Sequence, residues 1–523
     1  MACIGLLPLG RPNFDVDFAN EKLAAMLSRL DATGRDFAGP RHLLFDADQA
    51  RAALGDLERT GIDSLLILQV TFTDASMTVE ATAFDVPLAI WAVPEPRLGG
   101  RLRLNAFCGL NLASHALGLG KRQFAWAYGD PDDISDDDLA GLLDGTRLSG
   151  QIDGTASGAA PEPGQAIMDR IRGQRIGRIG EHPVGFHTCA YSAEGLADLA
   201  GVAVEEIALD TLFDKARAAD AAEVGKVHEQ AESELGGLAN VDQTELDRSL
   251  RLKVALSDLR NEGHYDAFAI RCWPETFTEY GGAVCGPVSI MGEARVPCAC
   301  EADVYGALTQ MILQETAQEP VFLADLVDID IGNNTAVVWH CGQAPRSMSA
   351  SDSEPQAALH SNRKMPLLYQ FVLKPGRITL VRVSQAFGKT KLILAGAEMP
   401  GDVDGVSIKD WITGESDGEV RPLYFERPPY AGLNVDGKQN ASNTYGQGVR
   451  EGKWKMLRYA LGHTDPNAPD EQWDVELFDM AADRGETTNL ALLNPDVVAR
   501  MIATARASHA PQPYAREPWP PAS

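Results

Sequence analysis

Short apolar runs alternate with amphipathic segments along most of the chain, and this alternation restricts the possible folds more than any other feature. The runs at 3–9 (CIGLLPL) and 64–70 (SLLILQV) are almost continuously apolar, which is typical of strands buried on both faces. Between them, 47–61 (ADQARAALGDLERTG) spaces its apolar residues as a helix does and ends in glycine. Strands and helices that alternate in this way indicate a doubly wound parallel sheet.

The alternation stops once and then resumes, which divides the chain into domains. A stretch rich in glycine, alanine, proline and serine (145–164) is typical of a linker. Beyond it we expect a long charged helical region over about 203–262 and a strand at 335–341 (TAVVWHC). From about 346 the pattern favours hairpins, with a Pro-Gly turn inside 369–384. The fold class predicted is α/β: two doubly wound Rossmann-like domains (1–165 and 166–345), a partial β domain (346–400) and an α+β region (401–523).

Charge and composition argue against several classes of partner. The chain has 74 acidic and 46 basic residues, a formal net charge of -28, so it repels nucleic acid and anionic membranes. It has no apolar run of roughly 18 residues, the length needed to span a membrane, and its N-terminus lacks the basic region of a signal peptide. We therefore expect a cytoplasmic protein whose ligand is a small neutral molecule or a cation.

The eight cysteines lie thinly through the chain in mostly apolar surroundings, which indicates reduced, buried thiols. Cys298 and Cys300 are too close together for a paired zinc knuckle, and no second pair complements them. We interpret them as core residues.

Two carboxylates follow apolar stretches. Glu301 comes after PCAC (297–300), and Asp325 comes after VFLA (321–324). At the carboxyl edge of a parallel sheet such residues point into the ligand crevice, where two of them can bind a hard divalent cation or move protons on a substrate. The alternative is structural: Glu301 as an acid at a helix N-terminus, and Asp325 as a loop cap. Spacing alone leaves both interpretations open.

Residues 1 to about 398 resemble the L-fucose/L-arabinose isomerase family. The resemblance rests on long segments in the expected order: GLLPLGRPNFDV, LQVTFTDASM, WAVPEPRLGGRLRLN, RCWPETFTEYG, PCACEADVYGALTQMIL, LADLVDIDIGNNTAVVWHCGQAP and HSNRKMPLL. It implies an aldose–ketose isomerase of carbohydrate metabolism, acting on a small sugar through an ene-diol and assembled as a homo-oligomer.

The resemblance also implies site residues. In that family the glutamate before the helix and the acid of the next strand bind Mn²⁺ and act as acid/base groups, roles that fall on Glu301 and Asp325. A histidine on the following strand is a further ligand in the arabinose isomerases, and His340 in VVWHCG is similarly placed. Without this resemblance, a lone histidine on an apolar strand is more often a core residue whose hydrogen bonds are satisfied.

The family pattern breaks after 400. Residues of about 395–510, including VREGKWKMLRY and VELFDMAADRGETTNLALLNPDVVARM, resemble the C-terminal subdomain of sulfatases, with Asn494 and Pro495 expected to start a closing helix. The sulfatase nucleophile motif, Cys or Ser followed by x-Pro-x-Arg, is absent from the sequence, which argues against sulfatase activity.

The isomerase family uses a further ligand histidine near the chain end, and nothing here takes its place. Only His463 and His509 follow residue 400, both in the sulfatase-like part. A non-catalytic sugar-binding or inactive fusion protein is therefore the alternative to an active isomerase.

Overall fold

The computed structural model describes residues 2–96, 102–148, 162–330, 334–388, 390–399, 423–427, 446–461, 468–483 and 485–508. They form two compact units, Met1–Val403 and Asp404–Ser523. None of the described helices has the length and apolar character needed to cross a membrane.

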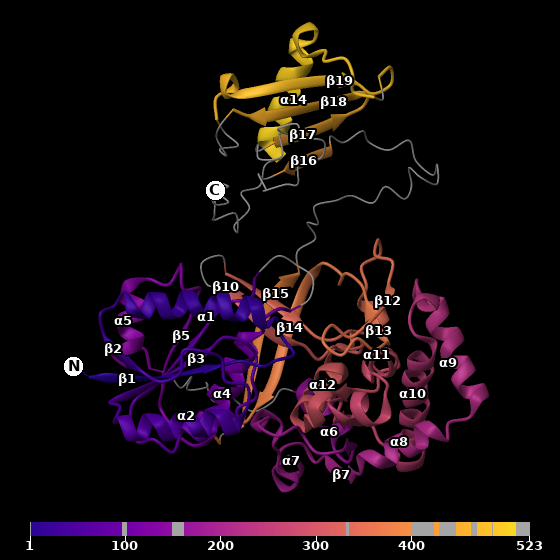
Figure 1. Ribbon diagram of the computed structural model, residues 1–523. Helices are drawn as coiled ribbons and strands as arrows, with labels where there is room; N and C mark the ends of the chain where they lie inside the picture. The colour runs from indigo at the N-terminus through magenta and orange to yellow at the C-terminus, as the bar shows by residue number, and fades with distance from the viewer. Residues whose placement is uncertain are drawn as a thin grey trace. The chain divides into compact units, whose positions relative to one another are not determined.

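The first domain contains a parallel sheet of five strands in the order β2-β1-β3-β4-β5 (Figure 1). The central strands are buried along almost their whole length, because helices cover both faces. Their bounds are β1 Cys3–Leu9, β2 Asp36–Ala38, β3 Ser64–Gln69, β4 Leu88–Ala92 and β5 Ala125–Tyr128.

The helices of this domain begin where the sequence provides capping side chains. Asp15, Asp46 and Ser135 each accept a hydrogen bond from a backbone N–H in the first turn of the helix that follows. The helices are α1 Val16–Asp31, α2 Ala47–Thr60, α3 Ser76–Ala81, α4 Ala106–Leu119 and α5 Asp136–Leu143. The predicted α/β architecture is confirmed here.

The second domain contains a parallel sheet of four strands in the order β7-β6-β8-β9. Its strands are β6 Arg175–Ile179, β7 Ala203–Ile207, β8 Ala267–Ile270 and β9 Cys298–Ala299. Its helices are α6 Glu162–Ile171, α7 Ala193–Ala200, α8 Leu209–Arg217, α9 Ala221–Glu234, α10 Gln243–Gly263, α11 Cys285–Glu293 and α12 Val304–Ala317. The region expected to be helical over 203–262 therefore opens with a strand, because β7 pairs with β6 at the sheet edge.

Three antiparallel hairpins follow the second sheet. The strand predicted at 335–341 is confirmed as β11 (Thr335–Trp339), but it pairs with β10 (Asp325–Asp330) in a hairpin and so does not join the parallel sheet expected of that domain. The hairpin predicted within 369–384 does not form. β13 (Leu368–Gln370) pairs with β12 (Gln356–Ala358), and β14 (Gly376–Ser384) pairs with β15 (Lys391–Met399). The Pro-Gly pair leads into β14 instead of reversing the chain.

The second unit contains an antiparallel sheet of four strands in the order β16-β17-β18-β19. They are β16 Leu423–Arg427, β17 Gly446–Glu451, β18 Trp454–Ala460 and β19 Trp473–Asp479. Helix α14 (Pro495–Ser508) begins at the expected proline and packs Met501 and Ile502 against Val449, Met456 and Leu477. The unit has an apolar core of its own.

Candidate active site

Glu301 lies in a tight turn between strand β9 and helix α12. β9 ends at Ala299, and one 3₁₀ turn (Cys300–Ala302) follows it. Glu301 and Ala302 both have left-handed backbone angles, with φ of 60° and 52°. Such a conformation costs a non-glycine residue about 1–2 kcal/mol and recurs at functional sites, although eight other non-glycine residues of the described chain also have positive φ. The turn places Glu301 just beyond the carboxyl end of the parallel sheet, where α/β folds bind ligands.

Glu301 does not begin the helix, so its interpretation as a helix N-terminal acid is wrong. Asp303 is the N-cap of α12, and its carboxylate accepts the Gly306 N–H at 2.8 Å. Glu301 has different partners: its N–H donates to Cys272 Sγ at 3.4 Å, and its Oε1 accepts from Trp273 Nε1 at 3.5 Å.

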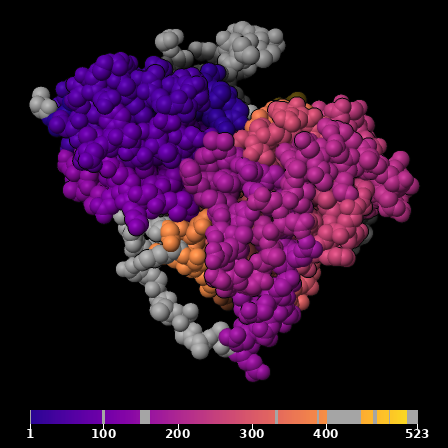
Figure 2. Space-filling model, turned by 90° about the horizontal axis from the view of Figure 1, so that it is seen from below, coloured from indigo at the N-terminus to yellow at the C-terminus, as the bar shows by residue number. Residues whose placement is uncertain are grey.

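Asp325 begins strand β10 and does not close a strand. The apolar residues 321–324 before it form no regular element, and β10 belongs to a hairpin that leaves the second domain. Leu326 and Ile329 of β10 pack against the core of the first domain, and Cys108 of α4 donates to the Leu326 carbonyl at 3.5 Å. Figure 2 shows the two domains side by side, with orange residues from the part of the chain just before residue 400 between them. Asp325 is therefore held where the domains meet.

The two carboxyls are close enough to influence each other's ionisation. Burial, and then the charge of Asp325, raise the pKa of Glu301 to about 8. Burial also raises the pKa of Asp325, while His340 opposes this rise. Two partly buried acids of this kind repel each other when both are ionised, and a cation placed between them relieves the repulsion.

His340 follows the last residue of β11 and belongs to the same electrostatic group. Burial alone would lower the pKa of His340, but Cys341, Asp325 and Glu301 together raise it to about 10. Its Nδ1 accepts the Cys341 N–H at 2.8 Å and lies 3.2 Å from Cys341 Sγ.

The donor types of Glu301, Asp325 and His340 suit Mn²⁺, which prefers carboxylate oxygen and tolerates imidazole. Among the described residues, however, these three do not bring their ligand atoms within 4.8 Å of one another, as Cys285, Cys341 and His360 do. Two features of His340 work against metal binding. The raised pKa favours the imidazolium, which has no free nitrogen for a metal, and the Cys341 N–H already occupies Nδ1. To bind a metal through Nε2, His340 must lose the proton on that nitrogen.

A second set of side chains that could bind a metal lies beside Glu301, Asp325 and His340. The sequence analysis did not identify this second set. The ligand atoms of Cys285, Cys341 and His360 all lie within 4.8 Å of one another, and the two sulfurs are 3.6 Å apart. Two sulfurs and an imidazole suit a soft ion such as Zn²⁺ better than Mn²⁺. The three residues are far apart in the sequence, so no spacing motif could indicate them.

Cys298 and Cys300 are buried, as predicted for core residues.

Aromatic and basic side chains form one wall of the site. Trp273 packs edge-on against Phe186, with ring centroids 5.4 Å apart, and Phe186 contacts Phe72 of the first domain. The guanidinium groups of Arg11 and Arg363 both lie against the Trp273 ring. Except for Phe186, these residues belong to the segments on which the isomerase resemblance rests, but nothing in their spacing shows that they meet.

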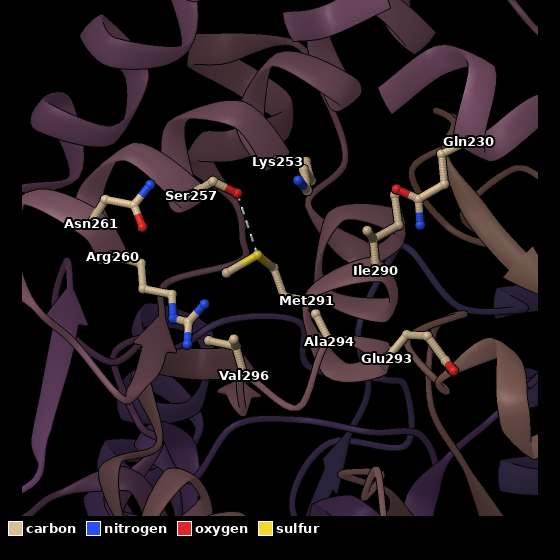
Figure 3. Close-up of a pocket in the computed structure, with 10 residues that line it drawn as sticks. All are labelled: Gln230, Lys253, Ser257, Arg260, Asn261, Ile290, Met291, Glu293, Ala294 and Val296. Carbon is tan, nitrogen blue, oxygen red and sulfur yellow. Dashed lines mark hydrogen bonds between the residues drawn. The ribbon is translucent and has the colours of Figure 1, made fainter. Parts of the chain in front are cut away.

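A cavity of about 290 Å³ lies elsewhere, between helices α10 and α11 (Figure 3). Lys253, Arg260 and Met291 line it, together with Val296 just before β9. Glu301 follows β9, so this cavity is at the opposite end of that strand and contains none of the predicted site residues.

Comparisons with known proteins agree with this architecture. Residues 5–144 match the family model "Fucose/sulfoquinovose isomerase, N-terminal domain". A sulfoquinovose isomerase from Alkalicoccus urumqiensis is 29% identical over 447 residues, which cover 83% of this chain and 95% of the relative. Another sulfoquinovose isomerase, from Priestia aryabhattai, is 30% identical over 381 residues, which cover 72% of this chain and 81% of the relative.

These matches define the class as aldose–ketose sugar isomerases. Within that class, the chain belongs to the fucose/sulfoquinovose isomerase family. The isomerase resemblance seen in the sequence is therefore confirmed.

The sulfatase resemblance has weaker support. Arylsulfatase K from Xenopus laevis is 26% identical over 182 residues, which cover 34% of this chain and 32% of that protein. The sulfatase-like nature of the C-terminal region stays a prediction. His463 and His509 lie outside the described residues.

Proposed function

We propose that this protein isomerises a sulfonated aldohexose of the sulfoquinovose type to its ketose. The proposal is supported by two acids, Glu301 and Asp325, which lie on different elements near the meeting of the two domains; the charge of Asp325 helps to raise the pKa of Glu301. The named activity of the relatives favours sulfoquinovose over the fucose and arabinose suggested by the sequence.

The two carboxyls have complementary roles in this reaction. One, in its ionised form, removes the proton from C2, while the other, in its acid form, gives a proton to the carbonyl oxygen at C1. The resulting ene-diol becomes the ketose when a proton returns to C1 and the C2 hydroxyl loses its own. The Trp273 indole N–H, 3.5 Å from Glu301 Oε1, orients that carboxylate.

A divalent metal is part of the proposal. Glu301, Asp325 and His340 would hold it, and a bound Mn²⁺ would polarise the oxygens on the two reacting carbons. Activity that depends on Mn²⁺ and is not restored by Zn²⁺ would favour this oxygen-rich set over Cys285, Cys341 and His360.

Isomerisation in D₂O tests the mechanism. Through an ene-diol, the proton taken from C2 exchanges with solvent, so we expect deuterium at C1 of the ketose by NMR. A ketose formed without deuterium would point to direct hydride transfer and contradict the roles of the two acids. Sugar binding without ketose formation would support the non-catalytic alternative.

A further inference from the structure

Two arginines from distant parts of the chain lie against one tryptophan at the site. Arg11 follows strand β1 of the first domain, and its guanidinium carbon is 5.0 Å from the Trp273 ring centroid. Arg363 lies in the loop between β12 and β13, and its guanidinium carbon is 5.8 Å from the same centroid. The Trp273 indole also donates to Glu301. One indole therefore contacts both arginines and Glu301.

The positive charge of these arginines is only partly balanced. Arg11 reaches Asp74 at 3.6 Å, a distance too long for a strong hydrogen bond, and Asp74 also accepts the Ser76 N–H. In the part of the chain that the structure describes, no carboxylate lies within ion-pair distance of Arg363. Nearby Arg271 differs, because Glu275 neutralises it through two bonds of 2.6 Å.

The electrostatics agree with this geometry. Burial lowers the pKa of Arg11, and the charge of Arg363 lowers it further although Asp74 opposes both. Burial also lowers the pKa of Arg363. Each guanidinium is thus partly desolvated, and the two repel each other. An anion bound between them would relieve both costs.

We infer that Arg11 and Arg363 form the subsite for the sulfonate of the sugar, with Trp273 beneath the sugar chain. A sulfonate is ionised at every physiological pH and offers three oxygens, which suits two planar guanidinium groups. In this arrangement the carbonyl end of the substrate lies at Glu301 and the sulfonate end at the arginines. The inference rests on the proposed function, and it explains how a site in this family selects a charged sugar over a neutral one.

The test measures affinity without turnover. The ligands are the 6-sulfonated hexitol and the corresponding 6-deoxyhexitol, neither of which has a carbonyl to isomerise. Calorimetry on the full-length protein gives the ratio of the two affinities. We expect the wild type to prefer the sulfonated hexitol at least about tenfold, the effect of a charge-assisted hydrogen bond, and Arg363→Met to reduce that ratio toward one. Arg363→Lys should keep part of the preference, because the charge remains.

Arg59→Met is the matched control, since Arg59 is exposed on α2 and pairs with Asp56 on the same helix. It should leave the ratio unchanged. A sulfonate preference that survives in both Arg363→Met and Arg11→Met would overturn the subsite. The proposed function has a separate test, because a wild type that forms no ketose from sulfoquinovose contradicts the reaction whatever the affinity ratio is.

Discussion

The chemistry proposed for this site depends on two residues, Glu301 and Asp325, whose backbones are held in place by different elements of the fold. Glu301 depends on a left-handed turn after β9, whereas Asp325 depends on a hairpin anchored to the first domain. A substitution can therefore change the chemistry of one acid while the position of the other stays the same.

Replacing Glu301 by glutamine should abolish turnover without unfolding the protein. The amide has nearly the same volume but cannot take up a proton, and loss of a general acid/base group lowers kcat by about a hundredfold or more. Steady-state kinetics and thermal unfolding measure the two effects. Glu319→Gln, at an exposed position beyond α12, is the control. If Glu301→Gln kept near-normal activity, the assignment of Glu301 would be wrong.

Asp325→Asn should weaken metal binding as well as turnover. The substitution removes a negative charge from the oxygen-rich set, so we expect the affinity for Mn²⁺ to fall at least about tenfold. Equilibrium dialysis with metal analysis measures this directly. Unchanged Mn²⁺ affinity would show that Asp325 has a structural role.

Among the elements, the β14–β15 hairpin supports the site from outside the parallel sheets. Arg382 of β14 pairs with Asp303, the cap of α12, and also donates to the Thr188 carbonyl at 3.3 Å. The Val383 N–H donates to Thr309 of α12 at 3.0 Å. The hairpin therefore fixes the start of the helix that follows Glu301.

Arg382→Met should destabilise the protein because it leaves Asp303, only 7% exposed, without its cation. Breaking a buried pair from one side costs about 3 kcal/mol in the free energy of unfolding, and the loss here should be smaller because the Arg382 side chain is 30% exposed. Urea denaturation measures the loss. Adding Asp303→Asn removes the unpaired charge but keeps the cap, so the double variant should recover part of the stability. If both variants were as stable as the wild type, the pair would have no structural role.

The sequence predicted the strands and helices of the α/β domains well, but it predicted the later hairpins poorly. Strands such as β1 and β3 are apolar along their length, and helices such as α1 begin at a capping side chain. The local sequence is therefore sufficient to predict these elements. The β10–β11 and β14–β15 hairpins could not be assigned, because their pairing is decided by tertiary contacts. Glu301 and Asp325 were proposed from family motifs and remain a prediction. The convergence of Arg11, Trp273 and Arg363 could not be predicted, since it results from the meeting of two domains.

In the whole molecule, the second unit should unfold more readily than the first. Its core is small, built around Val449, Met456, Leu477 and Met501, whereas the first domain packs a five-stranded sheet between helices. Hydrogen exchange followed by mass spectrometry should show faster exchange in 446–508 than in β1, β3 and β4. Equally slow exchange in both units would contradict the small-core argument.

We also predict that the protein is a homo-oligomer. Strand β15 exposes Leu392, Ile393 and Leu394 at 61%, 54% and 65%, an apolar run that monomers normally avoid at an exposed strand. Light scattering should give a mass above that of one chain, and Ile393→Lys should reduce it. A wild type that is monomeric at working concentrations would contradict this prediction.

The anchoring of Asp325 to the first domain has a consequence for motion. Glu301 lies in the second domain, while the hairpin that begins at Asp325 packs on α4 of the first. A hinge opening between the domains would therefore separate the two acids and pull Arg11 away from Trp273 in the same movement. Under the proposed mechanism, domains that open to admit a sugar must close again before the two acids can act on it.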